Sequence, residues 1–210
     1  MGEFKRPDGK LLIMMGIFAS FFVLANLLAF KKVEVGPLVL TMGLLAFPFM
    51  FLITDIVNEV YGPDNAKKVV FAGFVAMILS VVVAQIAIII PPASFFAGEG
   101  QDAFAMIFGA MPRITLGSVI AYLMSQYHDV WAFAFWRKVT GGKHLWLRNN
   151  LSTITSQALD SVVFIGIAFG GTVPLAILWS MILGQWVVKW LIAFAETPVC
   201  YLGVAWAKKD

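Results

Sequence analysis

The chain alternates long apolar runs with short polar, basic or Gly/Pro-containing segments. A membrane-spanning helix needs about 20 mostly apolar residues, because each residue adds ~1.5 Å across a ~30 Å hydrocarbon core. The pattern predicts spanning helices at about 11–30, 38–57, 69–90, 113–136, 149–169 and 174–198, the last extended to 207. We therefore predict one all-α membrane domain over residues 1–210, a bundle of six transmembrane helices.

The last apolar run, residues 174–207, needs a separate interpretation, because it is longer than one straight span requires. Pro198 disfavours the helical conformation for the residue before it. We expect one span with a kinked or interfacial extension, and two short helices are the alternative. On the first run, Ala25 and Ala29 are spaced to allow close contact with another helix.

Composition favours a membrane protein over a soluble one. Hydrophobic residues make up 60% of the chain and charged residues 13%, against about 45–50% and about 25% in soluble domains. The single cysteine excludes an intramolecular disulfide and a zinc cluster. We predict no metal and no cofactor. The net charge of +3 is spread over loops, so we attribute it to membrane topology and predict no nucleic-acid partner.

The basic residues orient the predicted bundle. With the N-terminus inside, eleven Lys and Arg residues fall in inner segments and three in outer segments. This is a positive-inside distribution, and an even number of spans keeps both termini cytoplasmic. The inner residues are Lys5, Arg6, Lys10, Lys67, Lys68, Arg137, Lys138, Lys143, Arg148, Lys208 and Lys209, and the outer ones are Lys31, Lys32 and Arg113.

Two charged residues lie near the middle of predicted spans. Asp160 is in the fifth span and Lys189 in the sixth. Charges within a bilayer usually pair or line a polar cavity, so we expect these two to be partners. Gln157 and Gln185 lie one helical turn before Asp160 and Lys189 and share their helix faces. The cluster is either a structural ion pair or part of a substrate site.

The sequence Ser-Gln-x-x-Asp occurs in two consecutive spans. The first copy contains Gln126 and Asp129, and the second contains Gln157 and Asp160. Such a recurrence is consistent with the internal symmetry of many transporters, and coincidence is the alternative. In either case both helices offer amide and carboxylate groups at similar depth, which suits a ligand rich in hydrogen-bond donors.

Acidic side chains also gather at the end of the second span. Asp55 and Glu59 are four residues apart on one helix face, a repulsive spacing unless a cation or proton donor intervenes. They are either part of a polar site or the solvated end of a helix before the Gly62-Pro63 turn.

Arg113 begins the fourth span directly after Pro112. A cation at a helix N-terminus faces the positive end of the helix dipole, so something negative should compensate it. Glu99, Asp102 or a bound ligand could do so. The preceding segment, 91–112, is too apolar for a solvated loop, and we expect either a lid or re-entrant piece or an interfacial helix.

The order and spacing of several motifs resemble the vitamin-uptake-transporter family of queuosine precursor transporters. The matching positions run in family order from about residue 40 to 205. They are Phe47-Pro48-Phe49 leading to Thr54 through Gly62; Pro112-Arg113-Ile114, Ala121-Tyr122-Leu123, Ser125-Gln126 and Asp129-Val130; Asn149-Asn150, Ser152, Ser156-Gln157, Asp160 and Phe164; and Lys189, Thr197-Pro198 and Tyr201.

The resemblance implies a multi-pass protein of the bacterial inner membrane, arranged like the substrate-binding subunits of energy-coupling-factor transporters. It implies transport of 7-deazaguanines such as preQ0 and preQ1, or of queuine. On this basis Asp160 or Glu59 would accept from the ring N–H and amino group, and Lys189 would hold the carboxylate's charge when the site is empty. A cationic preQ1 amine would meet Asp129 or Glu59. Gln126, Gln157 and Asn150 would read the carbonyl and ring nitrogens.

Other functions compete with a carrier. One is a binding subunit that needs a separate ATPase module. Another is a membrane-embedded enzyme acting on a lipid, for which Asp55 with Glu59 is an incomplete metal-binding candidate. The chain has no Gly-x-x-x-x-Gly-Lys-[Ser/Thr], His-Glu-x-x-His or Gly-x-Ser-x-Gly motif, so we predict that it is not an enzyme. We expect a small-molecule substrate and membrane lipids as partners, and homo-oligomerisation is left open.

Overall fold

The computed structural model describes residues 6–141 and 145–208, apart from the side chains of residues 137, 145–150 and 193–198. The chain forms two compact units. Unit 1 contains Met1–Lys32, Thr41–Pro112 and Leu191–Asp210, and unit 2 contains Val33–Leu40 and Arg113–Trp190. The prediction of a single six-helix domain stays a prediction.

Six helical stretches in the described residues are long and apolar enough to cross a membrane, which confirms the predicted all-α membrane bundle. They are Gly9–Leu28, Met42–Tyr61, Pro63–Ile89, Glu99–Trp136, Leu151–Phe169 and Leu175–Ile192.

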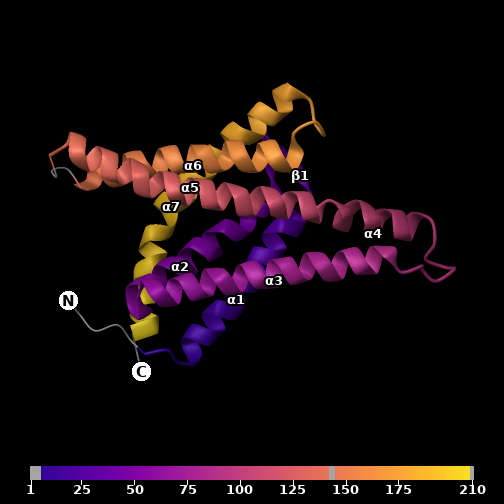
Figure 1. Ribbon diagram of the computed structural model, residues 1–210, viewed down its shortest axis with the longest axis horizontal. Helices are drawn as coiled ribbons and strands as arrows, with labels where there is room; N and C mark the ends of the chain where they lie inside the picture. Colours follow the sequence, from indigo (N-terminus) through magenta and orange to yellow (C-terminus); the bar gives the residue numbers. More distant parts are fainter. Residues whose placement is uncertain (1–5, 142–144, 209–210) are drawn as a thin grey trace. The chain divides into compact units, whose positions relative to one another are not determined.

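Unit 1 is built on three packed helices, α1 (Gly9–Leu28), α2 (Phe47–Tyr61) and α3 (Pro63–Ile89), with a 3₁₀ turn, η1 (Met42–Ala46), before α2 (Figure 1). The predicted turn between α2 and α3 is present. Gly62 has a φ of +86°, a conformation that glycine adopts without steric cost, and Pro63 follows as the first residue of α3.

Small residues let the backbone of unit 1 pack closely. A Cβ atom added to Gly43 of η1 would lie 2.6 Å from the carbonyl oxygen of Ala25 and 3.2 Å from the Cβ of Ala29. The close contact expected at Ala25 and Ala29 is therefore made, and it is made with η1.

Polar contacts join three helix ends in unit 1. Asp8 caps α1 by accepting from the backbone N–H groups of Lys10 and Leu11, each at 3.1 Å, and it also accepts from the Tyr61 hydroxyl of α2 at 2.7 Å. The Lys10 ammonium donates to the carbonyl of Trp206, near the end of α7 (Leu175–Lys208), at 3.3 Å. The start of α1, the end of α2 and the end of α7 therefore lie at one end of unit 1.

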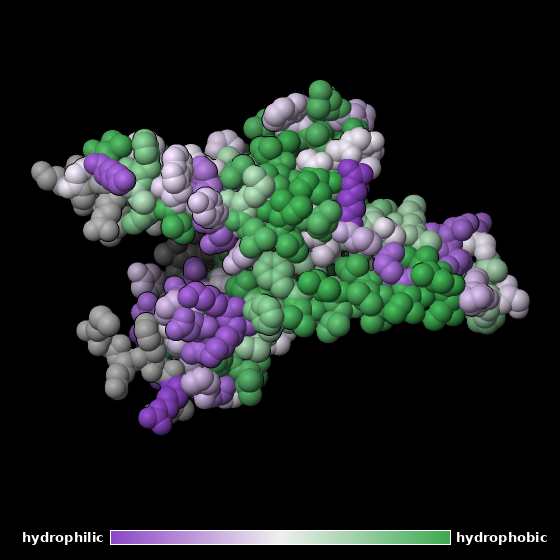
Figure 2. Space-filling view, in the orientation of Figure 1, coloured by the Kyte–Doolittle hydropathy of each residue, from purple (hydrophilic) through white to green (hydrophobic). Residues whose placement is uncertain are grey.

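The segment before α5 is a helix that packs on α3. It is α4 (Glu99–Gly109), which lies beside the end of α3 (Figure 1). The amide of Gln85 donates to the Phe108 carbonyl at 2.9 Å, and that of Gln101 donates to the Ile88 carbonyl at 3.1 Å. The surface of α3 seen in Figure 2 is mainly hydrophobic. The exposed side chains of α3 include Phe71 and Val83, as suits a helix facing lipid.

Unit 2 contains a β-hairpin and three helical segments. The strands are β1 (Lys32–Val35) and β2 (Leu38–Thr41), whose outer residues, Lys32 and Thr41, are assigned to unit 1. The helices are α5 (Met111–Val139), α6 (Leu145–Phe169) and the first part of α7. The hairpin contacts α7 through the Ser180 hydroxyl, which donates to the Pro37 carbonyl at 2.9 Å and accepts from the Val39 N–H at 3.0 Å.

One predicted boundary and one predicted alternative differ from the structure. Residues 38–41, predicted as the start of the second span, form β2, because a short apolar run suits a strand as well as a helix. The last run forms one continuous helix, α7, so the alternative of two short helices is wrong. The helical conformation is kept through Pro198 despite the local preference against it.

Candidate functional site

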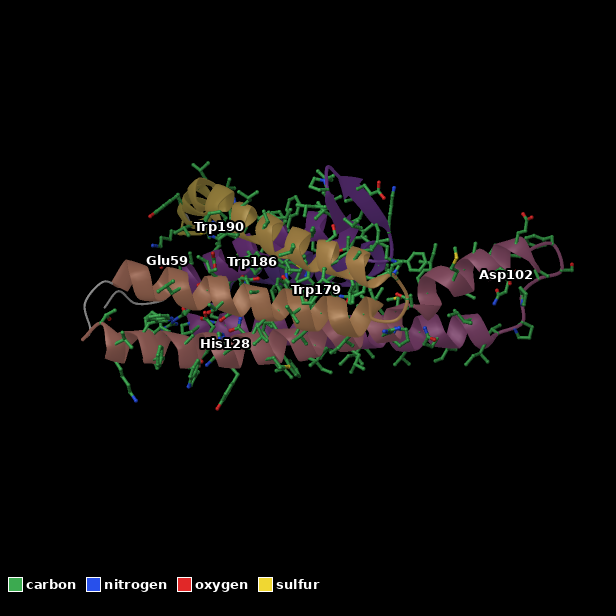
Figure 3. The ribbon with its side chains drawn as sticks, turned by 90° about the horizontal axis from the view of Figure 1, so that it is seen from above. Glu59, Asp102, His128, Trp179, Trp186 and Trp190 are labelled. Atoms are coloured by element: carbon green, nitrogen blue, oxygen red, sulfur yellow. The ribbon has the colours of Figure 1, made fainter. Side chains whose placement is uncertain are left out.

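In unit 2, α5 and α6 run antiparallel and side by side (Figures 1 and 3). Gly117 of α5 sits against the α6 backbone, where an added Cβ atom would lie 3.2 Å from the Phe164 carbonyl oxygen and 3.4 Å from the Ala168 nitrogen. Close approach at a small residue is typical of helix pairs in membranes. It brings polar side chains from both helices together further along the pair.

The two Ser-Gln-x-x-Asp segments face each other and are in side-chain contact. Ser125 of α5 contacts Asp160 of α6 at 3.5 Å, a long contact, and Ser156 of α6 contacts Asp129 of α5 at 3.2 Å. The serine of each copy therefore meets the aspartate of the other. The two contacts are about 6 Å apart along the helices, because four residues separate the serine and aspartate of each copy.

Asp160 also forms an ion pair with Lys189 of α7, as the sequence predicted. The lysine side chain is 2% exposed and the aspartate side chain 17%. Among the described residues, Asp129 forms no ion pair, although it occupies the equivalent position in the other copy. The two carboxylates thus have matching serine contacts and different charge environments.

Two glutamines beside this ion pair carry amide atoms without partners. Gln185 is 2% exposed, and neither its nitrogen nor its oxygen has a hydrogen-bond partner among the described residues. The Oε1 atom of Gln157 is likewise buried and unpartnered in the described part of the chain. Buried polar atoms are almost always hydrogen-bonded in proteins, so these atoms mark a candidate ligand site.

His128 extends the polar cluster on α5. Its Nδ1 atom lies 3.0 Å from the Ser156 Oγ, and this hydroxyl also contacts the Ser152 carbonyl at 2.7 Å. Histidine, serine and aspartate occur together here, but Asp129 contacts the serine rather than the histidine, so the arrangement differs from a catalytic triad.

The three tryptophans of α7 follow one another along the helix in Figure 3, and their environments differ. Trp179 and Trp190 are exposed, as expected of side chains that face lipid. The ring N–H of Trp186 donates to the Ile154 carbonyl of α6 at 3.1 Å, which fixes the crossing of α6 and α7.

The partner of Arg113 is neither of the two predicted carboxylates. Its Nε donates to the Ile167 carbonyl at 2.6 Å, and its Nη2 donates to the Gly170 carbonyl. The Ile167 carbonyl is in the last turn of α6 and the Gly170 carbonyl directly follows the helix, so Arg113 lies at the negative end of that helix dipole. Backbone dipoles therefore supply the compensation that the sequence required.

The other predicted site residues fall outside this cluster or outside the description. Asp55 and Glu59 belong to unit 1, both are exposed, and Glu59 pairs with Lys208 at 3.6 Å. Gln126 is on an exposed face of α5. The side chain of Asn150 lies outside the described residues.

The sequence reasoning missed Ser125, His128 and Ser156 as individual contacts. A usable signal was present. Two copies of Ser-x-x-x-Asp on consecutive antiparallel helices can meet so that each serine faces the other copy's aspartate. Comparing the two segments in antiparallel order would have identified both pairs.

A membrane-crossing helical fold with a buried ion pair and unpartnered amides defines the class of multi-pass membrane protein with an internal polar site. The chain belongs to the vitamin uptake transporter family: the family described as "Putative vitamin uptake transporter" matches residues 41–203. It is therefore a multi-pass transporter of the bacterial inner membrane that acts on small molecules.

The chain is similar to curated transporters from three bacteria. It is 34% identical to a "Probable queuosine precursor transporter" of Bacillus subtilis over 94% of this chain and 86% of that protein. It is 30% identical to the "Queuosine precursor transporter" of Escherichia coli over 61% of this chain and 55% of that protein. A Haemophilus influenzae relative is 32% identical over 61% and 52%. No solved structure matches the chain.

Proposed function

We propose that this chain imports queuosine precursors, 7-deazaguanines such as preQ0 and preQ1 or the base queuine. The substrate follows from the similarity over 94% of the chain to a protein named as a queuosine precursor transporter. The observation that supports a site in unit 2 is the buried Asp160–Lys189 pair with the unpartnered amides of Gln157 and Gln185.

The chemistry of these groups suits a guanine-like ring. One carboxylate can accept from both the ring N–H and the adjacent amino group, and Asp160 supplies one. Lys189 then balances the carboxylate's charge before the ligand arrives. Amide groups can donate to the ring carbonyl and accept from ring N–H groups. Asp129 supplies a second carboxylate for the ammonium of preQ1.

The topology we propose places both termini in the cytoplasm. It is supported by the excess of Lys and Arg in the predicted inner segments and by the contacts that join Lys10 to Trp206 and Lys208 to Glu59 in unit 1. The likeness to energy-coupling-factor binding subunits belongs to the same proposal. A binding subunit that needs a separate ATPase module is the alternative to this carrier, and assembly into homo-oligomers is compatible with both.

We propose that the protein transports its substrate without chemical change. The Ser156 hydroxyl contacts the Ser152 carbonyl at 2.7 Å, and the residue is 4% exposed, which suits a structural contact better than a nucleophile. The alternative of a lipid-modifying enzyme would draw on Asp55 and Glu59, and the 3.6 Å contact of Glu59 with Lys208 favours a solvated helix end.

The proposal is tested by thermal unfolding of the purified protein with preQ0, preQ1, queuine and guanine. A ligand that binds the folded state stabilises it by about 2.7 kcal/mol at a hundredfold excess over its Kd. We expect a rise in Tm with the 7-deazaguanines, and we expect Asp160→Asn to abolish it. Folded wild-type protein that shows no shift with any of them would contradict the proposed substrate.

A further inference from the structure

Gln185 is the least satisfied buried polar side chain that the structure describes in unit 2. It is 2% exposed, and both polar atoms of its carboxamide lack a hydrogen-bond partner among the described residues. Removing an amide from water without giving it new partners costs free energy. A packing role alone would be filled better by an apolar side chain of the same length, such as methionine.

The neighbours of Gln185 place this carboxamide beside the ion pair. Gln185 is one helical turn before Lys189, on the same face of α7, and Lys189 contacts Asp160. On α6, Gln157 lies between Ile154 and Asp160, and both of these residues form hydrogen bonds with α7. The buried Oε1 of Gln157 is unpartnered as well.

We propose that Gln185 is a specificity-determining contact of the substrate site, held unpaired within the protein so that it can bind a ligand edge on which a hydrogen-bond acceptor lies next to a donor. A carboxamide presents an N–H donor and a carbonyl acceptor side by side. Its complement is such an edge, formed in a 7-deazaguanine by a ring nitrogen and the nearby pyrrole N–H, which are separate from the ring N–H and amino group that Asp160 would bind. This inference rests on the proposed function and assigns the substrate edge that α7 reads.

The first test is the change Gln185→Met, which keeps the length of the side chain and removes both polar atoms. Without ligand, we expect a higher Tm than wild type, because the unpartnered atoms are gone. With preQ0 or preQ1, we expect at least about tenfold weaker binding, the loss typical of a hydrogen-bonding group. A purely structural role for Gln185 would instead lower the Tm.

The matched control is Gln85→Met in unit 1. The Gln85 amide donates to the Phe108 carbonyl at 2.9 Å, so this glutamine has a structural partner. We expect its removal to lower the Tm and to leave the affinity for preQ0 within about twofold of wild type. Gln185→Asn is a second variant at the site, which keeps the amide and retracts it, and we expect it to weaken binding without raising the Tm.

A modified ligand tests the edge itself. We would compare 7-deazaguanine with its derivative methylated on the pyrrole nitrogen, which lacks this N–H donor and keeps the ring N–H and amino group assigned to Asp160. Methylation should weaken binding to wild type at least about tenfold and should have little further effect on Gln185→Met. Equal effects of methylation on both proteins would overturn the assignment, as would a lower Tm or unchanged affinity for Gln185→Met. A wild type that binds none of these compounds would instead overturn the proposed function.

Discussion

Lys189 of α7 forms an ion pair with Asp160 of α6, and the lysine side chain is only 2% exposed. Removing one partner of a buried pair leaves an uncompensated charge, which costs about 3–5 kcal/mol. We expect Asp160→Asn and Lys189→Gln each to destabilise the folded protein by an amount in this range, measured by thermal unfolding in detergent.

The double variant separates structure from function at this pair. Asp160→Asn combined with Lys189→Gln removes both charges, so we expect it to regain most of the stability that either single change loses. We expect precursor uptake to remain absent, because the carboxylate that accepts from the ligand is gone. Uptake restored in the double variant would show that the pair serves only to stabilise the fold.

The two serine–aspartate contacts should differ in strength. The Ser156–Asp129 contact is 3.2 Å and the Ser125–Asp160 contact is 3.5 Å; both exceed the usual range of a hydroxyl hydrogen bond, and the second exceeds it by more. We expect Ser156→Ala to cost about 1–2 kcal/mol of unfolding free energy and Ser125→Ala less. Thermal unfolding of both alanine variants makes the comparison, and the reverse order would contradict the geometry.

Asp129 should distinguish cationic from neutral ligands. It has the serine contact of its counterpart Asp160, and among the described residues it has no basic side chain paired with it. We expect Asp129→Asn to weaken binding of preQ1, which carries an ammonium, at least about tenfold more than binding of the neutral nitrile preQ0.

Titration calorimetry or ligand-induced shifts in Tm would measure this selectivity. Asp102→Asn, in the exposed acidic first turn of α4, is the control and should leave both affinities unchanged. An equal loss for both ligands in Asp129→Asn would remove Asp129 from the ammonium site.

Gly117 should tolerate no large side chain. A Cβ atom placed on Gly117 would lie only 3.2 Å from the Phe164 carbonyl oxygen. The larger side chain of Gly117→Leu must therefore push α5 and α6 apart. We expect a loss of about 1–3 kcal/mol or misfolding, and a smaller effect from Gly117→Ala. Gly166 of α6 has no atom within 4 Å of its added Cβ, so Gly166→Leu should be tolerated in the same unfolding measurement.

The sequence predicted the features that follow from the cost of placing polar groups in lipid. Apolar run length identified the spanning helices because the hydrocarbon core has a fixed thickness. Asp160 and Lys189 were paired in advance because each is too costly alone in a bilayer. Gln157 and Gln185 were placed beside them by helical spacing, although nothing in the pattern indicated that their amides lack partners.

Contacts to the backbone and the choice between local conformations could not be predicted in the same way. Arg113 donates to carbonyls at the end of α6, and such acceptors are present at every helix end regardless of sequence. The Leu38–Thr41 segment is apolar enough to be assigned to a spanning helix. Its strand conformation depends on pairing with β1 across the turn, which its own residues do not indicate. Pro198 shows that a local preference can be outweighed within a long helix.

The reciprocal contacts of α5 and α6 also bear on how this part of the protein moves. Both serine–aspartate contacts depend on one antiparallel alignment, so sliding one helix along the other by a single turn would break both at once. Sliding is also opposed by sterics at Gly117, where the two helices come close at Phe164. If α5 moved along α6, a larger α5 side chain would have to take the place of Gly117 in this narrow gap. We therefore expect α5 and α6 to travel as one rigid element during the transport cycle, with hinges at their ends rather than a sliding surface between them.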